Sequence, residues 1–478
     1  MVLMVGSSSV FSQKKGYTID ITVKGLKDTT IILGHYLGKS MYPDDTIQLD
    51  KSGKGVFKDK TTLGQGLYIV YLPDGKYFEL LMGTDQEFSI YNDTLDLVKN
   101  LNITGSPDNT LFADFQRFML QKRDQMEEMQ KNYAAATDDK EKEKIKTAIQ
   151  ELGKERITKI NSTVKENPTL FASTFLKATL ETDVPESIQH DQEKAYQYYK
   201  KHYFDNFDLS DVRLMLTPLY EDKMLHYLDK VLIQIPDTLI LEIDKIIDAS
   251  QIDSSLFRYV LITLFNKYGK SNIMGMDAVQ VHIAEKYYIP YATWSTPEFI
   301  KELKERVAIL NPILLGKKAP DVQLRYIPTD HFKAAENDTA LKRHPHAGEF
   351  FNISDIQADF TVLLFWEATC SHCKTAVPEL HKLYQDSLKA MNVKVIAVST
   401  LFGEDGKEKW IDFVNSHKLY DWINAWNPYD YQFKIIYDVR TTPQIFILNK
   451  NKEIIGKKLG PEDIVGLIEA YKKHFKNE

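Results

Sequence analysis

The sequence predicts a chain of several domains: an N-terminal antiparallel β domain, a central all-α domain and a C-terminal α/β domain. Three observations lead to this division. The chain has 478 residues, which is too many for one ordinary hydrophobic core. The spacing of apolar residues changes from period two to period 3.6 after about one hundred residues, and buried-type strands alternate with helices near the end. We place the boundaries at 1–12, 13–105, 106–311 and 312–478.

The composition is that of a globular protein without an obvious polyanionic partner. Hydrophobic residues make up 43% and charged residues 27% of the chain, and the formal net charge is −7. An acidic chain gives no reason to expect nucleic acid as a partner. We also expect no membrane span, because no apolar run approaches the roughly 18–20 residues that a span requires.

The first twelve residues resemble the end of a secretory signal. They are apolar and then small, and residues 10–12 form a tolerable cleavage site before Gln13. The positively charged leader is missing, so the alternative is a mildly apolar, frayed terminus. No cysteine lies nearby, which argues against a lipid anchor. We expect an exported protein, and a chain with only two cysteines fits an oxidising compartment.

The segment 13–105 has the pattern of an antiparallel β domain. Residues 17–23 alternate strictly between apolar and polar side chains, as a half-buried strand does. Turn sequences separate the later strands, notably at 50–53 and 73–76. The segment shows no nucleophile beside a base, so we expect a binding or positioning module. The further predicted strands are 31–33, 46–49, 56–58, 66–72, 77–82 and 88–91.

The segment 106–311 has helical periodicity throughout. We expect two long helices that form a hairpin with its turn near 137–139, then further helices to about Tyr288 and one at 297–310. Methionines form a stripe along the first helix, and we expect that stripe to be core. No chemistry is apparent in this region.

The segment 312–478 predicts a small α/β sheet with helices on both faces. Its expected order is β-α-β-α-β-β-α, with strands at 362–366, 393–399, 444–449 and 453–457 and a last helix at 461–475. We expect a polar loop at 329–348. The loop contains His331, His344 and His346, but a metal site there is disfavoured because no acidic or thiol ligand stands at a fixed spacing.

The two cysteines, Cys370 and Cys373, form a C-x-x-C between a predicted strand and a predicted helix. A sharp strand-to-helix turn places Cys370 at the helix N-terminus, where free N–H groups and the helix dipole favour a thiolate. Two intervening residues also bring both sulfurs within reach of a disulfide. A structural zinc site would need two further ligands, and no second C-x-x-C exists.

Several motifs resemble those of one known family. The last ~160 residues resemble a thioredoxin-fold domain of the TlpA/ResA type of exported thiol–disulfide oxidoreductases. The β and helical segments are similar to the DUF4369 and DUF5106 domains of envelope proteins of that group. The matching residues are Gly316-Lys-Lys-Ala-Pro-Asp321, Phe365-Trp366, Cys370-Ser-His-Cys373 and Thr442-Pro443.

The resemblance implies a role for each residue of the motif. Cys370 would attack a substrate disulfide, and Cys373 would resolve the mixed disulfide. His372 would tune the reduction potential by stabilising the thiolate, although it is alternatively a solvated residue of little influence. Pro443 would be the cis-proline opposite the cysteines, and Thr442 would shape the contact with a substrate strand. The resemblance implies no cofactor beyond a redox-active Cys370–Cys373 disulfide.

Two further residues are expected to tune the reduction potential, and two positions differ from the family pattern. Ser371 and Trp366 are grouped with His372 as tuning residues. Thr369 stands where the family usually has tryptophan, and Leu364 occupies the place of thioredoxin's buried acid. The nearest acid after the following strand is Glu404, which we expect to accept the proton of the resolving thiol.

The functional prediction is a periplasmic thiol–disulfide oxidoreductase that acts as a reductase on envelope proteins. A membrane-bound thiol donor would keep it reduced. The alternative is an interaction or scaffold protein whose disulfide is structural or sensory. A thiol peroxidase is disfavoured, because the proline expected ahead of a peroxidatic cysteine is absent and the two cysteines stand too close together.

Overall fold

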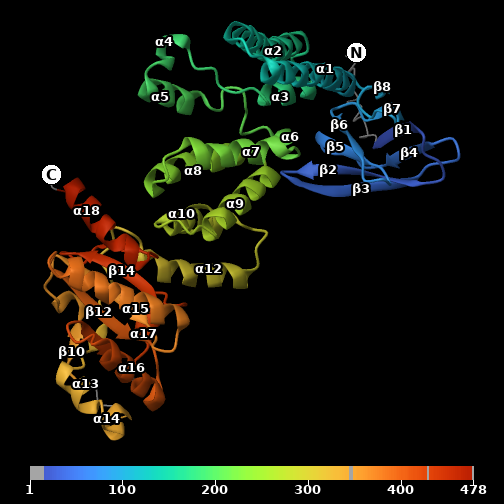
Figure 1. The fold of residues 1–478 in the computed structure, drawn as a ribbon. Coiled ribbons are helices and arrows are strands. Elements are labelled where there is room, and N and C mark those ends of the chain that lie inside the picture. Colours follow the sequence, from blue (N-terminus) through green and yellow to red (C-terminus); the bar gives the residue numbers. More distant parts are fainter. Residues whose placement is uncertain (1–15, 344–347, 428–429, 476–478) are drawn as a thin grey trace, which may run out of the picture. The chain divides into compact units, whose positions relative to one another are not determined.

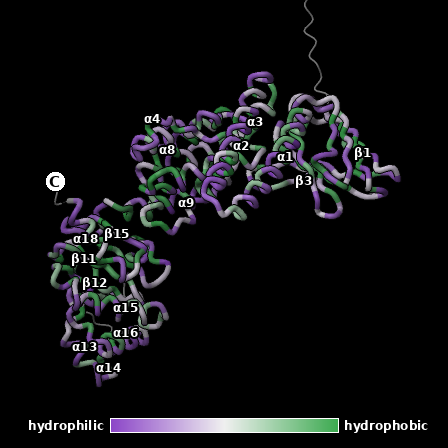
Figure 2. Tube along the Cα trace, turned by 45° about the horizontal axis from the view of Figure 1, so that its top comes forward, coloured by the Kyte–Doolittle hydropathy of each residue, from purple (hydrophilic) through white to green (hydrophobic). Residues whose placement is uncertain are grey.

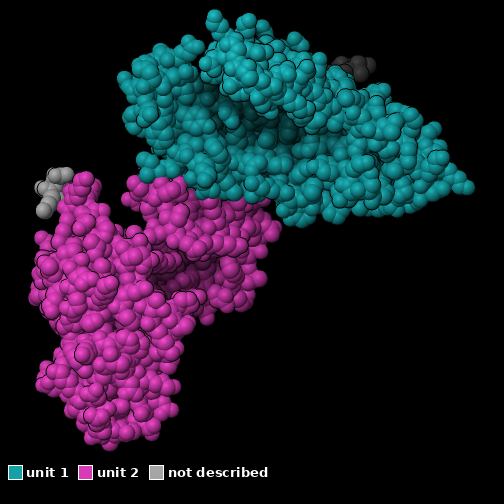
Figure 3. Space-filling model, in the orientation of Figure 1, with its two compact units in different colours: residues 1–233, 242–257 teal, residues 234–241, 258–478 magenta. Residues whose placement is uncertain are grey.

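The computed structural model describes residues 16–343, 348–427 and 430–475, and the predicted signal segment lies outside them. The chain divides into two compact units (Figure 3). Unit 1 comprises residues 1–233 and 242–257, and unit 2 comprises residues 234–241 and 258–478. The region predicted as one helical domain therefore contributes helices to both units.

Unit 1 begins with two four-stranded sheets whose inner faces share one core (Figure 1). Ile19 and Ile21 of one sheet join Ile31 and Leu33 of the other in that core. The predicted antiparallel β domain is confirmed, with one difference: β1 and β7 pair in parallel. The first sheet has the order β4 (Lys54–Asp59), β1 (Tyr17–Lys24), β7 (Glu87–Asp93) and β8 (Asn102–Thr104), and the second β3 (Ser40–Gln48), β2 (Thr30–Leu37), β5 (Gly66–Tyr71) and β6 (Tyr77–Met82).

A helical hairpin follows the sheets, as predicted from the spacing of apolar residues. It consists of α1 (Pro107–Ala135) and α2 (Asp139–Glu166). Its burial is concentrated towards the base: Phe115 belongs to a core cluster, whereas Tyr133 near the far end of α1 is exposed. The expected methionine core is wrong: Met119, Met126 and Met129 are only partly buried, and of the three only Met119 packs against this cluster. The next helices are α3 (Phe171–Ala178), α4 (Glu186–Gln189), α5 (Gln192–His202), α6 (Val212–Met215) and α7 (Pro218–His226), with a π-helical turn at Tyr227–Val231.

Two helices contain the boundary between the units. These are α8 (Pro236–Ser250) and α9 (Ser254–Gly269). Unit 2 continues with α10 (Met276–Ile283), a π-helical turn at Ala284–Tyr288, α11 (Ile289–Tyr291), α12 (Pro297–Leu310) and a 3-10 turn at Asn311–Ile313.

The rest of unit 2 is an α/β domain around a five-stranded sheet of order β13-β12-β11-β14-β15. The neighbours β11, β12 and β13 run parallel to one another. The strand β14 is antiparallel to β11, and β15 is antiparallel to β14. The sheet strands are β11 (Phe360–Trp366), β12 (Val393–Ser399), β13 (Ile423–Trp426), β14 (Gln444–Asn449) and β15 (Ile454–Lys457). The remaining elements are β9 (Gln323–Arg325), α13 (Thr329–Ala335), α14 (Thr339–Arg343), β10 (Phe350–Asn352), a 3-10 turn (Ile353–Asp355), α15 (Ser371–Leu383), a π-helical turn (Tyr384–Leu388), α16 (Gly403–His417), α17 (Gln432–Ile436), a 3-10 turn (Pro461–Asp463) and α18 (Ile464–Phe475).

The central strand β11 is buried along its whole length, as its apolar run predicts. Val362 and Leu364 join the core that α15, α16 and α18 help to form, whereas Phe365 stacks on Phe433 of α17 with ring centroids 5.7 Å apart. Alternate residues of the strand thus pack on opposite faces of the sheet. The apolar residues of β11 and β12 can be followed as green stretches in Figure 2.

The structure corrects two expectations for this domain. The segment 329–348, predicted as a polar loop, contains α13 and α14, and His331 lies on α13. Phe332 and Ala335 explain the error, because both are fully buried and give α13 an apolar face. The strand β13 was also missing from the predicted order. His344 and His346 lie outside the described residues.

Candidate functional site

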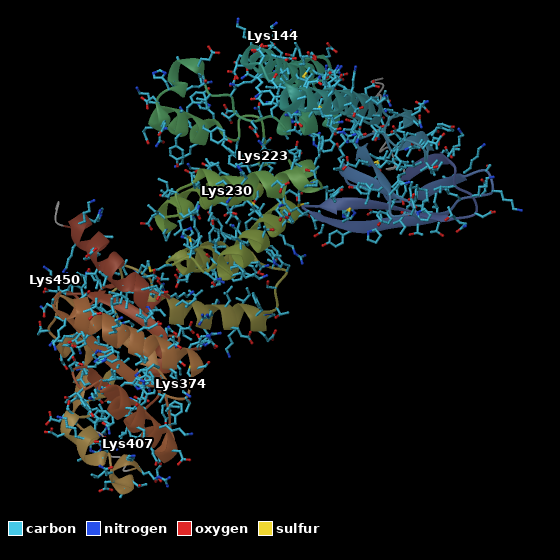
Figure 4. The ribbon with its side chains drawn as sticks, viewed as in Figure 1. Lys144, Lys223, Lys230, Lys374, Lys407 and Lys450 are labelled. Carbon is cyan, nitrogen blue, oxygen red and sulfur yellow. The ribbon has the colours of Figure 1, made fainter. Side chains whose placement is uncertain are left out.

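The candidate site lies where the central strand β11 turns into helix α15. Cys370 is the N-cap residue of α15, as predicted, and Cys373 lies in the first turn. The turn is closed by the Cys370 amide, which donates to the Glu367 carbonyl at 3.2 Å. Figure 4 labels Lys374, the residue after Cys373, and so marks the start of α15. Both cysteines are free thiols.

Cys373 is the inner thiol. Its side chain is completely buried, and the backbone amide of Glu367 donates to its Sγ at 3.5 Å. Burial raises the pKa of Cys373 to about 12, because a thiolate would lose its hydration there. At neutral pH this cysteine is a thiol, so it needs to give up a proton before it can react.

Cys370 is the outer thiol, and it is partly exposed. Burial alone would raise the pKa of Cys370, but hydrogen bonds from the Cys373 backbone, the Thr442 side chain and the His372 backbone outweigh it and lower the pKa. These donors stabilise the thiolate at a helix N-terminus. The Cys370 Sγ also lies 3.3 Å from the Thr442 carbonyl oxygen, to which the neutral thiol donates.

The segment that faces Cys370 contains the expected cis-proline. The Thr442–Pro443 peptide bond is cis, which confirms that expectation. Thr442 and Pro443 are both partly exposed, so their backbone lies beside the outer thiol and remains accessible. The structure thus brings together Cys370, Cys373 and Thr442.

The predicted tuning residues lie in different surroundings. Ser371 and His372 are exposed in the first turn of α15. Trp366 is fully buried, and its ring packs against Phe413 with centroids 5.0 Å apart. Glu404 is exposed in the first turn of α16 and interacts electrostatically with Arg343. Its role as a proton acceptor stays a prediction.

A different acid, Glu367, stands next to the thiols. Its carboxylate accepts a hydrogen bond of 2.7 Å from the hydroxyl of Thr400, a buried residue at the end of β12. The Thr400 amide also donates to the Trp366 carbonyl at 2.9 Å, which joins the two strand ends. Partial burial lowers the pKa of Lys434, and the nearby Glu367 carboxylate opposes that shift. The signal for Glu367 was its place three residues before Cys370, after the last buried residue of the strand.

Within 16–343, 348–427 and 430–475, no group of three or more His, Cys, Asp or Glu side chains is arranged to hold a metal ion. No helix in these ranges combines the length and apolar character that a membrane crossing needs.

Models of three protein families match the chain, in the order expected from the sequence. A domain of unknown function, DUF4369, matches residues 17–112, and a second one, DUF5106, matches residues 134–308. A thioredoxin-like family matches residues 358–454, which include both cysteines. A search of curated proteins found no match.

Solved structures that resemble the chain include three bacterial proteins. A domain of a possible thiol-disulfide isomerase from Cytophaga hutchinsonii is 30% identical, and the match covers 35% of this chain and 99% of that one, with a TM-score of 0.29. A thioredoxin-like protein from Bacteroides caccae is 19% identical over 60% of this chain and 97% of that one, with a TM-score of 0.43. The thioredoxin domain of a thiol-disulfide oxidoreductase from Bacteroides vulgatus is 21% identical over 33% and 96%, with a TM-score of 0.26. On these family matches, the chain carries a thioredoxin-like domain at residues 358–454, preceded by a DUF4369 domain and a DUF5106 domain.

Proposed function

We propose that the protein is a periplasmic reductase that exchanges its Cys370–Cys373 dithiol with disulfides of envelope proteins. The observation that carries this proposal is the contrast between the two thiols. Cys370 is accessible and has a lowered pKa, whereas Cys373 is buried and has a pKa of about 12. Such a pair suits an attacking thiol and a resolving thiol.

The reaction begins at the outer thiol. The Cys370 thiolate attacks one sulfur of the substrate disulfide, so that a Cys370–substrate disulfide forms and the other substrate sulfur leaves as a thiolate. Cys373 then loses its proton and attacks the Cys370 sulfur. The second substrate sulfur leaves, and the Cys370–Cys373 disulfide remains. Two electrons pass from the protein dithiol to the substrate, and both substrate thiolates take up protons.

Four further parts complete the proposal. The chain's own cysteine pair carries the electrons, so the reaction needs no bound cofactor. The oxidised protein has to be reduced again, and we propose a membrane-bound thiol donor for this step. His372 and Ser371, exposed beside the attacking sulfur, tune the reduction potential. Thr442 and Pro443 present the backbone against which the substrate strand lies.

The test replaces Cys373 by serine in the full chain, so that mixed disulfides cannot be resolved. Incubation with an oxidised envelope extract should give Cys370-linked adducts on a non-reducing gel that dithiothreitol removes. The control is the variant with both cysteines replaced by serine, which should give none. A Cys373→Ser protein that forms no adducts would exclude a thiol–disulfide oxidoreductase that acts on envelope proteins.

A reduction-potential titration distinguishes the scaffold alternative. A structural disulfide has a potential below about −300 mV. Such a value, together with the absence of turnover of a disulfide substrate, would identify a stabilising bond. A higher potential with turnover supports the reductase.

A further inference from the structure

An ion pair links helix α12 to the loop that contains Thr442. Arg306 on α12 forms a bidentate hydrogen-bonded pair with the carboxylate of Asp438, 132 residues further along the chain; the Nη2 to Oδ2 distance is 2.6 Å. Both residues belong to unit 2. The Arg306 side chain is 32% exposed and that of Asp438 16%, so water only partly screens the pair. Bidentate pairs of this kind fix orientation as well as distance.

Asp438 begins the loop 438–443 between α17 and β14. Its φ of 48° is left-handed, a conformation that aspartate tolerates better than most residues. Its carboxylate also accepts from Arg440 Nε at 2.9 Å. Burial opposes ionisation, but the hydrogen bonds from Arg306 and Arg440 outweigh it and lower the pKa of Asp438. The carboxylate is therefore ionised at neutral pH, and the loop is held from α12 at its first residue.

The far end of the same loop contacts the attacking sulfur. The Thr442 carbonyl lies 3.3 Å from Cys370 Sγ, and the Thr442 side chain contributes to stabilising the thiolate. The base of the loop is closed by Gln444, whose side-chain amide donates to the Tyr437 carbonyl at 3.0 Å. Tyr437 is fully buried and anchors the inner side of the loop. The outer side is anchored through Asp438.

We infer that Arg306 is a positioning residue for thiol–disulfide exchange: through Asp438, helix α12 holds the Thr442–Pro443 segment against Cys370. The inference rests on the proposed function, since it assigns Arg306 a part in that reaction. It also gives the central helices a defined task, which is to fix one wall of the active site.

A second ion pair between the helices and the sheet supplies a matched control. Lys457 on the edge strand β15 pairs with Asp277 of α10, and its Nζ also donates to the Ile313 carbonyl at 2.7 Å. This pair attaches the same helical region to the same domain, and its hydrogen bonds do not reach the loop 438–443, to which Lys457 is linked only by its electrostatic attraction to Asp438. Asp277→Asn should therefore weaken the attachment and leave the active-site loop in place.

The experiment measures the pKa of Cys370 in the full chain from thiolate absorbance at 240 nm, in a Cys373→Ser background so that one thiol reports. We expect Arg306→Gln and Asp438→Asn each to raise this pKa by about 0.5–1 unit, because a loosened loop withdraws the Thr442 side chain from the thiolate. The double variant should shift it no further, because both changes break one pair. With Cys373 intact, the rate with oxidised glutathione at pH 7 should fall about two- to threefold, since the loss of thiolate is partly offset by its higher nucleophilicity.

An unchanged or lowered Cys370 pKa in both single variants would overturn the inference. An equal rise in Asp277→Asn would do the same, because general loosening would then explain the shift. If Arg306→Gln does not fold, Arg306→Lys retains the charge but not the bidentate geometry, and a Cys370 pKa equal to that of the wild type would contradict the inference. The test is separate from that of the proposed function: failure of the wild type to reduce any disulfide refutes the function, whatever the variants show.

Discussion

At the scale of single residues, the surroundings of each cysteine determine the pKa of its thiol. The two cysteines are three residues apart in one helical turn, yet donors surround Cys370 and apolar side chains surround Cys373. The sequence could indicate the attacking cysteine because helix N-termini have general properties. It could not identify Glu367 as the adjacent acid, because its partner Thr400 stands 33 residues away at the end of another strand.

Lys407 illustrates the same point within the core. It lies on α16, where Figure 4 labels it, and it is fully buried. Its Nζ stands 3.4 Å from His331 Nε2 and 3.4 Å from the Leu341 carbonyl oxygen. Burial lowers the pKa of Lys407 to about 8. In the unfolded chain the pKa returns to about 10.4, so between these values the unfolded chain binds more protons and stability rises with pH.

Replacing Lys407 by methionine should therefore stabilise the protein at pH 7, where folding otherwise buries a charge. We expect a gain of about 1–2 kcal/mol that shrinks as the pH rises from 8 to 10. Urea unfolding followed by tryptophan fluorescence reports on this core, since Trp410 and Trp426 lie in it. The control is Lys409→Met on the same helix, whose side chain is exposed. A loss of stability in Lys407→Met at pH 7 would show that the charged form is well accommodated.

At the scale of elements, strands and helices with a strong periodicity of apolar residues were predictable from the sequence. Short elements and helices in polar sequence were not. The buried run 362–366 and helix 297–310 follow directly from their patterns. The strand β8 has only three residues, Asn102–Thr104, which is too short for a period to show. The helices α13 and α14 lie in a polar sequence, and the burial of Phe332 depends on tertiary packing.

Helix α1 shows how an element can depend on one polar side chain. The buried Asn109 in its first turn accepts from the Leu81 amide and donates to the Leu81 carbonyl, both at 2.9 Å. The side chain thus makes the two backbone hydrogen bonds that a neighbouring strand would otherwise make with the edge strand β6. Because these backbone groups are buried, they would lose their partners if the amide were removed.

Asn109→Ala should destabilise the contact between α1 and β6 by about 2–3 kcal/mol, the cost of leaving a buried donor and acceptor unpaired. Hydrogen exchange of peptides that cover β6 should accelerate accordingly. Asn132→Ala is the matched control, because Asn132 is exposed near the far end of the same helix. Equal exchange in the two variants would mean that Asn109 does not hold the strand.

At the scale of the whole molecule, the order of domains was readable but their connections were not. The family matches follow the order expected from the sequence, and the C-terminal fold is confirmed. Contacts such as Arg306–Asp438 join residues 132 positions apart, and no local pattern signals them. The division of the helical region between two units likewise depends on packing. The Arg306–Asp438 contact is the one through which we infer that the helical region positions the loop beside Cys370.

The central claim is that Cys370 attacks and Cys373 resolves. Its most direct test is the pH dependence of alkylation in the reduced full chain, with iodoacetamide as reagent and peptide mass spectrometry to locate each adduct. Cys370 should be modified with an inflection below the ordinary thiol pKa of about 8.5, and at pH 7 it should react at least about 100-fold faster than Cys373. Equal rates, or a faster reaction at Cys373, would contradict the account.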